Sequence, residues 1–307
     1  MTEYLPEGSR LHKAENAAAI RSTEALLCAM RNGTVLEARA VVCDSSHNLI
    51  VDLPCMQGII PREEGARGIN DGTTRDIALI ARAGKPVCFR VMRIEQDENG
   101  SPRAILSRRS VQEECWNNYL SKLRAGDIIP VRITHMERFG CFVDAGCGIP
   151  SLIPIDSISV SRISHPSDRF RTGQHIRAVV TGFDIGKLCL SHKELLGTWE
   201  ENAALFSAGE TVAGIIRSVE DYGVFIELTP NLAGLAEPQS QLRTGQCASV
   251  YIKALIPEKM KVKLVIVDVF EPDCPMPPIK YFTNESHINR WKYTPPDAPK
   301  LIESIFE

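Results

Sequence analysis

Residues 125–191 open with AGDIIPVRITHMERFGCFVDAGCGIPSLIP and close with GQHIRAVVTGFDIGKLCLS. The first half is rich in β-branched and aromatic residues, and apolar and polar residues alternate over Val131, Ile133 and His135. A period of two is typical of a half-buried strand, in which every second side chain faces the core. The stretch therefore predicts one small β-barrel, and we interpret the other folded parts of the chain as variants of it.

Gly140 interrupts the strand end, with Phe139 and Phe142 on either side of it. A regular strand would turn these two rings to opposite faces. A glycine bulge would reset the alternation and place both rings on one side. Two interpretations are open: the rings fill the barrel core, or they form an exposed platform on which bases stack. The spacing recurs as Tyr222-Gly223-Val224-Phe225, and a tyrosine hydroxyl needs a partner in a small core, which favours the platform.

The stretch resembles the RNA-binding repeat of bacterial small-subunit ribosomal protein S1, an OB-fold barrel of five antiparallel strands. That family's motif has a glycine before the first strand, an aromatic-Gly-x-aromatic-Val strand end, a Gly-Leu-Val-His turn, a glycine before the fourth strand and a closing Leu-Ser. At these places the chain has Gly126, Phe139-Gly140-Cys141-Phe142-Val143, Ser151-Leu152-Ile153-Pro154, Gly173 and Leu190-Ser191. Pro154 stands where the family's RNA-contacting histidine would be.

Two landmarks recur three times in the same order. A first strand is opened by residues 32–35 (NGTV), 125–128 (AGDI) and 208–211 (AGET), and a later strand by residues 83–85 (AGK), 171–174 (RTGQ) and 243–246 (RTGQ). Such repetition indicates tandem copies of one structural unit. We therefore predict an all-β chain of three tandem OB-fold barrels joined by short α-helices.

The expected parts follow from these landmarks. They are an N-terminal helical segment (1–32), a divergent first repeat with an insertion (33–110), a linker helix (111–123), the second repeat (124–191), a second linker helix (192–207), the third repeat (208–270) and a Pro-rich extended tail (271–307).

The composition limits the classes of function. The chain has 307 residues, a net charge of -3 and a pI of about 6.2, so it lacks the global basic surface of many nucleic-acid binders and any RNA affinity must be local. Ten cysteines form no CxxC pair and no Cys/His cluster, which predicts free thiols in a reducing cytosol and no metal site. The sequence shows no signal peptide and no membrane span. We expect no cofactor, no membrane contact and a cytoplasmic location.

The first repeat departs most from the family's pattern. Before it, Ser22 and Thr23 predict the N-cap of a short helix that stops at Gly33 and packs on the first barrel. The strand end of this repeat is His47-Asn48-Leu49-Ile50-Val51, so both aromatic positions are replaced and Asn48 takes the glycine's left-handed place. The insertion, residues 65–82, predicts a loop over 68–74. We expect this barrel to be structural or protein-facing.

The second repeat carries Phe139 and Phe142 and four candidate polar contacts. Residues 183–187 align with the family's Asp-x-x-Gly-Arg turn, which implies that Asp184 fixes the loop and that Lys187 meets a phosphate without arginine's bidentate fork. Arg132 and Arg177 line the same groove if they face outward.

In the third repeat Tyr222 and Phe225 restore the platform. Lys253, Lys261 and Lys263 lie near its last strand. Lys259, Lys261 and Lys263 are two residues apart, a spacing that would place all three on one face of a strand. A phosphate track and a plain solvent-facing row are equally compatible with that spacing. Glu237 and Glu258 replace the family's histidine and aspartate, which lowers the RNA affinity expected there.

The linkers and the tail carry the remaining aromatic residues. Apolar residues recur at helical spacing over 111–123 and 192–206, where Trp116 and Trp199 are expected to anchor helix to barrel. Prolines exclude a strand or long helix through PDCPMPP at 272–278. We expect an extended strap that lays its aromatic rings on a barrel and ends in a helix over 300–306.

Exposed rings beside cations predict a non-catalytic protein that binds single-stranded RNA, including mRNA. The resemblance implies association with the small ribosomal subunit. A protein-docking scaffold built on OB barrels is the main alternative, since the net charge is acidic. An accessory module of an RNA-processing enzyme is a third, but no segment outside the repeats is large enough for a domain of clustered carboxylates, so no catalytic residue is predicted. Exposure of the four rings discriminates between the first two.

Overall fold

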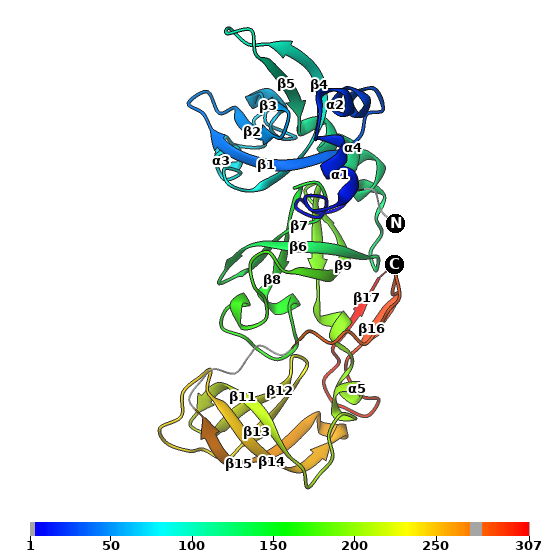
Figure 1. Cartoon of the computed structure of the whole chain (residues 1–307). Coiled ribbons are helices and arrows are strands. Elements are labelled where there is room, and N and C mark those ends of the chain that lie inside the picture. The colour runs from blue at the N-terminus through cyan, green and yellow to red at the C-terminus, as the bar shows by residue number, and fades with distance from the viewer. Residues whose placement is uncertain (1–3, 271–277, 307) are drawn as a thin grey trace. The chain divides into compact units, whose positions relative to one another are not determined.

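The computed structural model describes residues 4–270 and 278–306. The chain is all-β, with three closed five-stranded barrels, which confirms the predicted barrel count (Figure 1). It divides into two compact units, Met1–Leu123 with Asp144–Pro150, and Arg124–Val143 with Ser151–Glu307. We call them unit 1, which holds the first barrel, and unit 2, which holds most of the second barrel and all of the third.

The three barrels share one topology. In chain order the strands are β1 (Leu36–Cys43), β2 (Leu49–Leu53), β3 (Met56–Ile60), β4 (Pro86–Gln96) and β5 (Pro102–Ser107) in the first barrel, β6 (Ile128–Glu137), β7 (Gly140–Asp144), β8 (Pro150–Pro154), β9 (His175–Asp184) and β10 (Lys187–Ser191) in the second, and β11 (Thr211–Glu220), β12 (Gly223–Thr229), β13 (Leu232–Ala236), β14 (Cys247–Ile256) and β15 (Lys261–Phe270) in the third.

Each barrel closes in the same way. The third and fifth strands run parallel, as in the pair of Ala236 with Leu264, and the first and fourth strands pair antiparallel, as in the pair of Val212 with Val250. In β14, as in a regular strand, side chains alternate between the core and the outer surface, so Val250 and Ile252 are buried while Tyr251 between them points outward. This alternation fixes which residues can meet a ligand.

Helices are few and short. They are α1 (Ala14–Ala19), α2 (Thr23–Arg31), α3 (Ile77–Ile80), α4 (Arg109–Asn118), α5 (Trp199–Ala203) and the 3-10 helices η1 (Arg62–Glu64), η2 (Leu120–Lys122), η3 (Ile155–Ser157), η4 (Pro166–Asp168), η5 (Lys193–Leu196) and η6 (Pro257–Lys259). Helix α2 begins where the Ser22 hydroxyl accepts the N–H of Ala25. Its Leu26 is fully buried in the core of the first barrel. In the described part of the chain, no helix is long and apolar enough to span a membrane.

The left-handed residue of the first repeat is His47, with φ 63°, and not Asn48 as predicted. The Asp44 carboxylate accepts the N–H groups of Ser46 and Asn48. Asn48 in turn receives the N–H of Arg62 on its side-chain oxygen. These hydrogen bonds fix Asn48 just before β2, so the left-handed conformation of the turn is adopted by His47, the residue before it.

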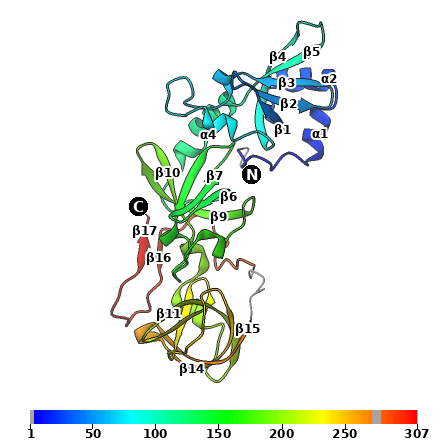
Figure 2. The ribbon, with the colours of Figure 1, turned by 90° about the vertical axis from the view of Figure 1, so that its left-hand side faces the viewer.

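The tail forms a hairpin of β16 (Arg290–Lys292) and β17 (Glu303–Ile305), whose strands run side by side (Figure 2). The helix predicted over 300–306 is therefore wrong, because pairing with β16 supplies partners for an extended backbone. Trp291 and Tyr293 are buried in one hydrophobic cluster with Trp199 of α5 and the core residues of the third barrel. Most of the PDCPMPP stretch lies outside the described residues.

Eight cysteines are free thiols: Cys28, Cys43, Cys55, Cys88, Cys115, Cys141, Cys147 and Cys189. Cys247 on β14 is disulfide-bonded, so the expectation of free thiols throughout is wrong at this position. Disulfide pairing depends on which segments meet in space, which spacing along the chain does not reveal.

The N-terminal segment of unit 1 is held by buried carboxylates. Glu7 is 2% exposed and accepts two hydrogen bonds from the Arg108 guanidinium at 2.6 and 3.0 Å. Glu37 on β1 is fully buried and accepts the N–H groups of Gly8 and Arg10. Burial raises the pKa of Glu37 to about 7, because its charged form loses water without gaining a cationic partner at hydrogen-bond distance.

Glu37 makes unit 1 less stable as the pH rises. Its pKa is higher in the folded state than in the unfolded chain, so its favourable contribution is complete below about pH 4.5 and is lost as the pH passes 7. We expect Glu37→Gln to raise the free energy of unfolding at pH 8 by about 1–3 kcal/mol and to change it little at pH 4.5. Urea titrations at both pH values measure this, with the exposed Glu15→Gln as control. Equal effects of Glu37→Gln at both pH values would contradict the assignment.

In unit 2 a buried ion triad joins the second barrel to the third. Arg169, in the segment between β8 and β9, donates two hydrogen bonds to Glu227 on β12. Arg217 on β11 donates to the same carboxylate at 2.8 Å. The Arg169 and Glu227 side chains are only 6% and 3% exposed. The two barrels are thus fixed to each other by charges that cannot separate without exposing an uncompensated partner.

Removing the shared carboxylate leaves buried Arg169 without its ion-pair partner and leaves Arg217 with the longer pair to Asp168, at 3.7 Å. We expect Glu227→Gln to lower the free energy of unfolding of unit 2 by about 3–5 kcal/mol. The control is Glu303→Gln, which breaks the more exposed pair with Arg290 and should cost less than about 1 kcal/mol. Urea unfolding followed by tryptophan fluorescence compares the two. A cost for Glu227→Gln no greater than that of the control would show that the triad does not hold the barrels together.

Candidate nucleic-acid interface

The second barrel presents two phenylalanines on its outer surface. Phe139 lies in the turn between β6 and β7 and is 56% exposed, while Phe142 in β7 is half-buried. Their ring centroids lie 6.0 Å apart with the planes at 90°. The neighbouring Cys141 and Val143 point into the barrel and are fully buried. The interpretation that these two phenylalanines fill the core is therefore wrong.

The third barrel repeats this arrangement with a tyrosine. Tyr222 lies in the turn between β11 and β12 and is 68% exposed, and its ring centroid lies 6.1 Å from that of Phe225 with an interplanar angle of 84°. Val224 and Ile226, the residues on either side of Phe225, are buried in the core. We call each of these T-shaped couples a ring pair.

In the third barrel the rings share one side for a different reason than a bulge at the glycine between them. Glu220, Val219 and Ser218 pair in unbroken register with Gly223, Val224 and Phe225, and the register shift of this hairpin falls earlier, between Ile216 and Ser218. Tyr222 belongs to the turn, where strand alternation does not apply. The bulge prediction at Gly223 is therefore wrong, although its consequence for the rings is observed.

The glycine is required because another backbone passes close to it. A Cβ on Gly140 would lie 2.4 Å from the Ile153 carbonyl oxygen, and one on Gly223 would lie 2.7 Å from the Ala236 carbonyl oxygen. Heavy atoms cannot approach that closely without displacing a strand. The glycines thus allow the neighbouring strand to pack directly beneath each ring pair.

Alanine at either glycine should displace the strand and the ring pair with it. We expect Gly140→Ala and Gly223→Ala each to lower the free energy of unfolding by about 1–3 kcal/mol. Gly182→Ala is the matched control, because Gly182 also has positive φ but has nothing within 4 Å of its Cβ position. Thermal unfolding measures the difference. The explanation fails if the control is destabilised as much as the two ring-pair variants.

On the third barrel a cross-strand row connects the ring pair to lysine. Phe225 on β12 pairs with Leu235 on β13, and Leu235 pairs with Lys263 on β15. Lys261 and Lys263 alternate with buried Val262 and Leu264, so both point outward and are exposed. An aromatic ring and two cations therefore lie on neighbouring strands of one outer surface.

The predicted lysine row is shorter than the spacing indicated. Lys259 belongs to η6 and not to the strand, because Met260 adopts a left-handed φ of 47° and breaks the extended backbone. Lys253 lies at a register shift between Ile252 and Ala254, next to the pair of Ala254 with Lys263. This bulge brings a third exposed lysine beside the row.

The second barrel has fewer cations at the corresponding places. Lys187 is exposed at the start of β10, but Cys189 pairs with Leu152 where the third barrel has Lys263 paired with Leu235. The turn before Lys187 is made by left-handed Ile185 and Gly186, with φ 46° and 70°. These two backbone conformations are those of a tight hairpin turn. The role of Asp184 in fixing this loop stays a prediction.

The two candidate arginines of the second barrel differ in their contacts. The Arg177 guanidinium donates to the carbonyl oxygens of Thr283 and Glu285 and lies 5.5 Å from the Tyr281 ring centroid. Its contacts therefore serve the tail. Arg132 points outward on β6 and donates to the Gly173 carbonyl oxygen at 3.2 Å. It lies on the strand next to Phe142 and remains a candidate phosphate contact.

Two residues at the ring pairs were missed from the sequence. The His135 ring stacks on Phe142 at 6.3 Å with 22° between the planes, and it hydrogen-bonds Glu137. Leu235 is 37% exposed between Phe225 and Lys263. The period of two in each strand gives the face of such residues, but only the cross-strand register reveals their neighbours.

The first barrel has an aliphatic row where the others have rings. Ile50 on β2 pairs with Ile59 on β3, and Ile59 pairs with Ile105 on β5. Val42 on β1 pairs with Ile50 and is 49% exposed. This surface offers no aromatic face to a base.

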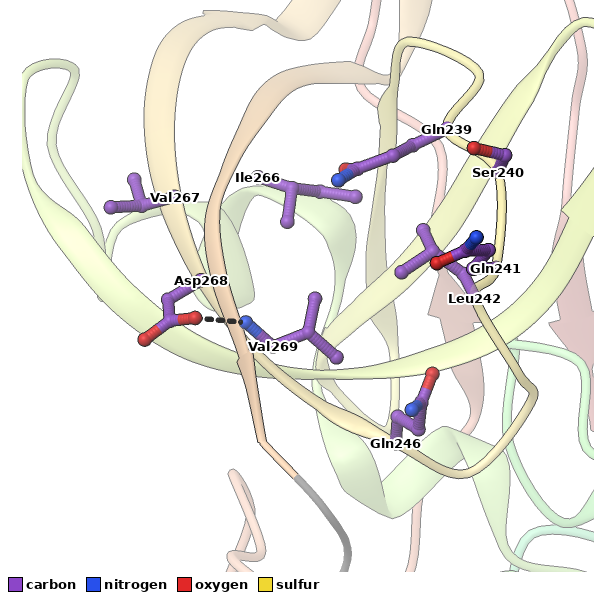
Figure 3. Close-up of a pocket in the computed structure, with 9 residues that line it drawn as sticks. All are labelled: Gln239, Ser240, Gln241, Leu242, Gln246, Ile266, Val267, Asp268 and Val269. Atoms are coloured by element: carbon purple, nitrogen blue, oxygen red, sulfur yellow. Dashed lines mark hydrogen bonds between the residues drawn. The ribbon is translucent and has the colours of Figure 1, made fainter.

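The third barrel also holds a shallow polar pocket of about 310 Å³ between the loop after β13 and the end of β15 (Figure 3). Its lining residues are Gln239, Ser240, Gln241, Leu242, Gln246, Ile266, Val267, Asp268 and Val269. None belongs to a ring pair. Across residues 4–270 and 278–306, no group of three or more His, Cys, Asp or Glu side chains is placed to hold a metal ion.

Residues 122–193 match the S1 RNA binding domain family. The chain is similar to small ribosomal subunit protein bS1 of Leuconostoc lactis, with 27% identity over 235 residues, covering 70% of this chain and 52% of that protein. It is 29% identical over 195 residues to a bS1 homolog of Bacillus subtilis, covering 61% and 49%. It is 26% identical over 282 residues to bS1 of Staphylococcus aureus strain COL, covering 84% and 69%. The chain thus spans about half the length of the first two relatives.

Proposed function

Since the chain belongs to the S1-type family of tandem OB-fold proteins, we propose that it binds single-stranded RNA, mRNA included, through its second and third barrels. The observation that carries this proposal is the pair of exposed T-shaped ring pairs at the same place in both barrels. We further propose that the protein is non-catalytic and cytoplasmic, and that it acts at the small ribosomal subunit.

Stacking on the rings accounts for affinity without sequence preference. Every base has an aromatic face, and each base stacked on a protein ring contributes about 1–3 kcal/mol. Lys261 and Lys263 lie on the same outer surface as Phe225, where they meet phosphates and release counterions. The net charge of -3 means that this attraction comes from local cations.

Two weak contacts become one stronger one when they are linked. Both ring pairs belong to unit 2, and the Arg169–Glu227–Arg217 triad holds their barrels together. A strand bound at one ring pair therefore meets the other at a high effective concentration. The second and third barrels should bind a long RNA more tightly than either ring pair alone.

A second function is favoured for the first barrel alone. Its row of Val42, Ile50 and Ile59 replaces the rings with aliphatic side chains. Such a surface suits contact with a protein better than contact with a base. We propose that this barrel is protein-facing, with the small ribosomal subunit as the source of its partner.

The direct test titrates a fluorescent single-stranded RNA at several salt concentrations. We expect Phe139→Ala/Phe142→Ala and Tyr222→Ala/Phe225→Ala each to weaken binding at least tenfold, since each removes two stacking faces. Lys261→Gln/Lys263→Gln should instead reduce the slope of log affinity against log salt by about 1.4.

Val267→Ala is the control, because Val267 is 61% exposed on β15 and is not part of the ring pairs. Wild-type affinity in both ring-pair variants, with circular dichroism unchanged, would leave the docking scaffold as the better account. Co-sedimentation with purified small subunits tests the ribosomal part of the proposal separately.

A further inference from the structure

Tyr251 on β14 is a third outward aromatic ring of the third barrel. It is 40% exposed, and its neighbours Val250 and Ile252 are buried in the core. It pairs with Thr211 on one side and with Val265 on the other. Tyr251 belongs neither to the family's motif nor to the ring pair.

In the other two barrels the residue at the corresponding position is ion-paired or buried. Counting six residues from the glycines Gly84, Gly173 and Gly245 gives Arg90, Val179 and Tyr251. Arg90 forms an ion pair with Glu114 of α4. Val179 is fully buried beside Leu195 and Phe306. Of the three positions, the one in the third barrel has an exposed aromatic ring.

Lysines lie between Tyr251 and the ring pair. β15 is the neighbour of both β13 and β14, as Figure 1 shows. Lys263 on this strand pairs with Leu235 on one side and Ala254 on the other, and Val265, the partner of Tyr251, is the next outward residue. Lys253 follows Tyr251 by two residues at the bulge. The cations are thus bordered by Phe225 on one side and Tyr251 on the other.

We propose that Tyr251 is a further RNA-stacking residue, which receives a base after the strand has left the ring pair and crossed the lysines of β15. From β12 to β14 this path covers three strand spacings, about 14 Å. A polyanion fits it because Lys253 and Lys263 lie along it, and it continues the surface already assigned to RNA. The inference rests on the proposed function and extends its binding surface to a fourth strand.

The length of the RNA distinguishes Tyr251 from the ring pair. The experiment uses the full-length chain with Phe139→Ala/Phe142→Ala, so that the binding measured is that of the third barrel. We compare fluorescent oligouridines of about 4 and about 12 nucleotides, lengths within the usual site sizes of one OB fold. We expect Tyr251→Ala and Tyr251→Leu to weaken binding of the longer RNA about fivefold or more and to leave the shorter one unchanged. Tyr251→Phe should retain wild-type affinity, and Val267→Ala is the exposed control on the neighbouring strand.

The leucine variant keeps an apolar side chain and so separates loss of stacking from loss of packing. Unchanged binding of the longer RNA by Tyr251→Leu, while Tyr222→Ala/Phe225→Ala weakens both lengths, would overturn this inference and leave the proposed function standing. Equal weakening of both lengths by Tyr251→Leu also overturns it, since the ring would then act on the fold or on the ring pair. If neither the Tyr222→Ala/Phe225→Ala variant nor a Tyr251 variant changes binding of either length, the proposed function of the third barrel fails with it.

Discussion

The close passage of a strand backbone beneath Gly140 and Gly223 is the constraint on which the two ring pairs depend. The carbonyl oxygens of Ile153 and Ala236 occupy the space that a side chain at these glycines would need. Because the strands meet there, the preceding turn projects Phe139 or Tyr222 over the outer face of the next strand, where Phe142 or Phe225 already points outward. A packing requirement inside the barrel thereby places two rings on the same side of its surface.

In unit 2 one group of charged residues stabilises the fold, and another lies where it can contact a ligand. Arg169, Arg217 and Glu227 are buried and hold two barrels together, whereas Lys253, Lys261 and Lys263 are exposed beside a ring pair. Ion pairs in the first group are costly to break, and cations in the second group are free to meet a mobile polyanion. A chain with a small net negative charge can therefore present a local cationic surface without a basic composition.

The sequence predicted the barrels and the outward direction of the four rings because both follow from local patterns: a period of two along strands and a turn motif that occurs twice. It named Lys253, Lys261 and Lys263 in the third repeat, but it did not separate them from cations that lie elsewhere or have other contacts. Arg177 was expected in a groove, but it holds the tail through contacts more than a hundred positions away in sequence. Lys259 lies outside the strand because Met260 breaks the extended backbone. The positions of Leu235 and Tyr251 next to the ring pair and the lysines follow only from the cross-strand register. Contacts between residues far apart in the sequence leave no local sequence pattern from which they could be predicted.

The central claim is that single-stranded RNA stacks on the ring pairs. Nuclear magnetic resonance of the aromatic ring protons, during titration with a single-stranded oligonucleotide, tests it most directly, because a stacked base shifts the protons of the ring beneath it. The account predicts saturable upfield shifts at Phe139, Phe142, Tyr222 and Phe225, with buried Phe89 of the first barrel unmoved. Binding that shifts resonances elsewhere while these four rings stay unchanged would contradict it.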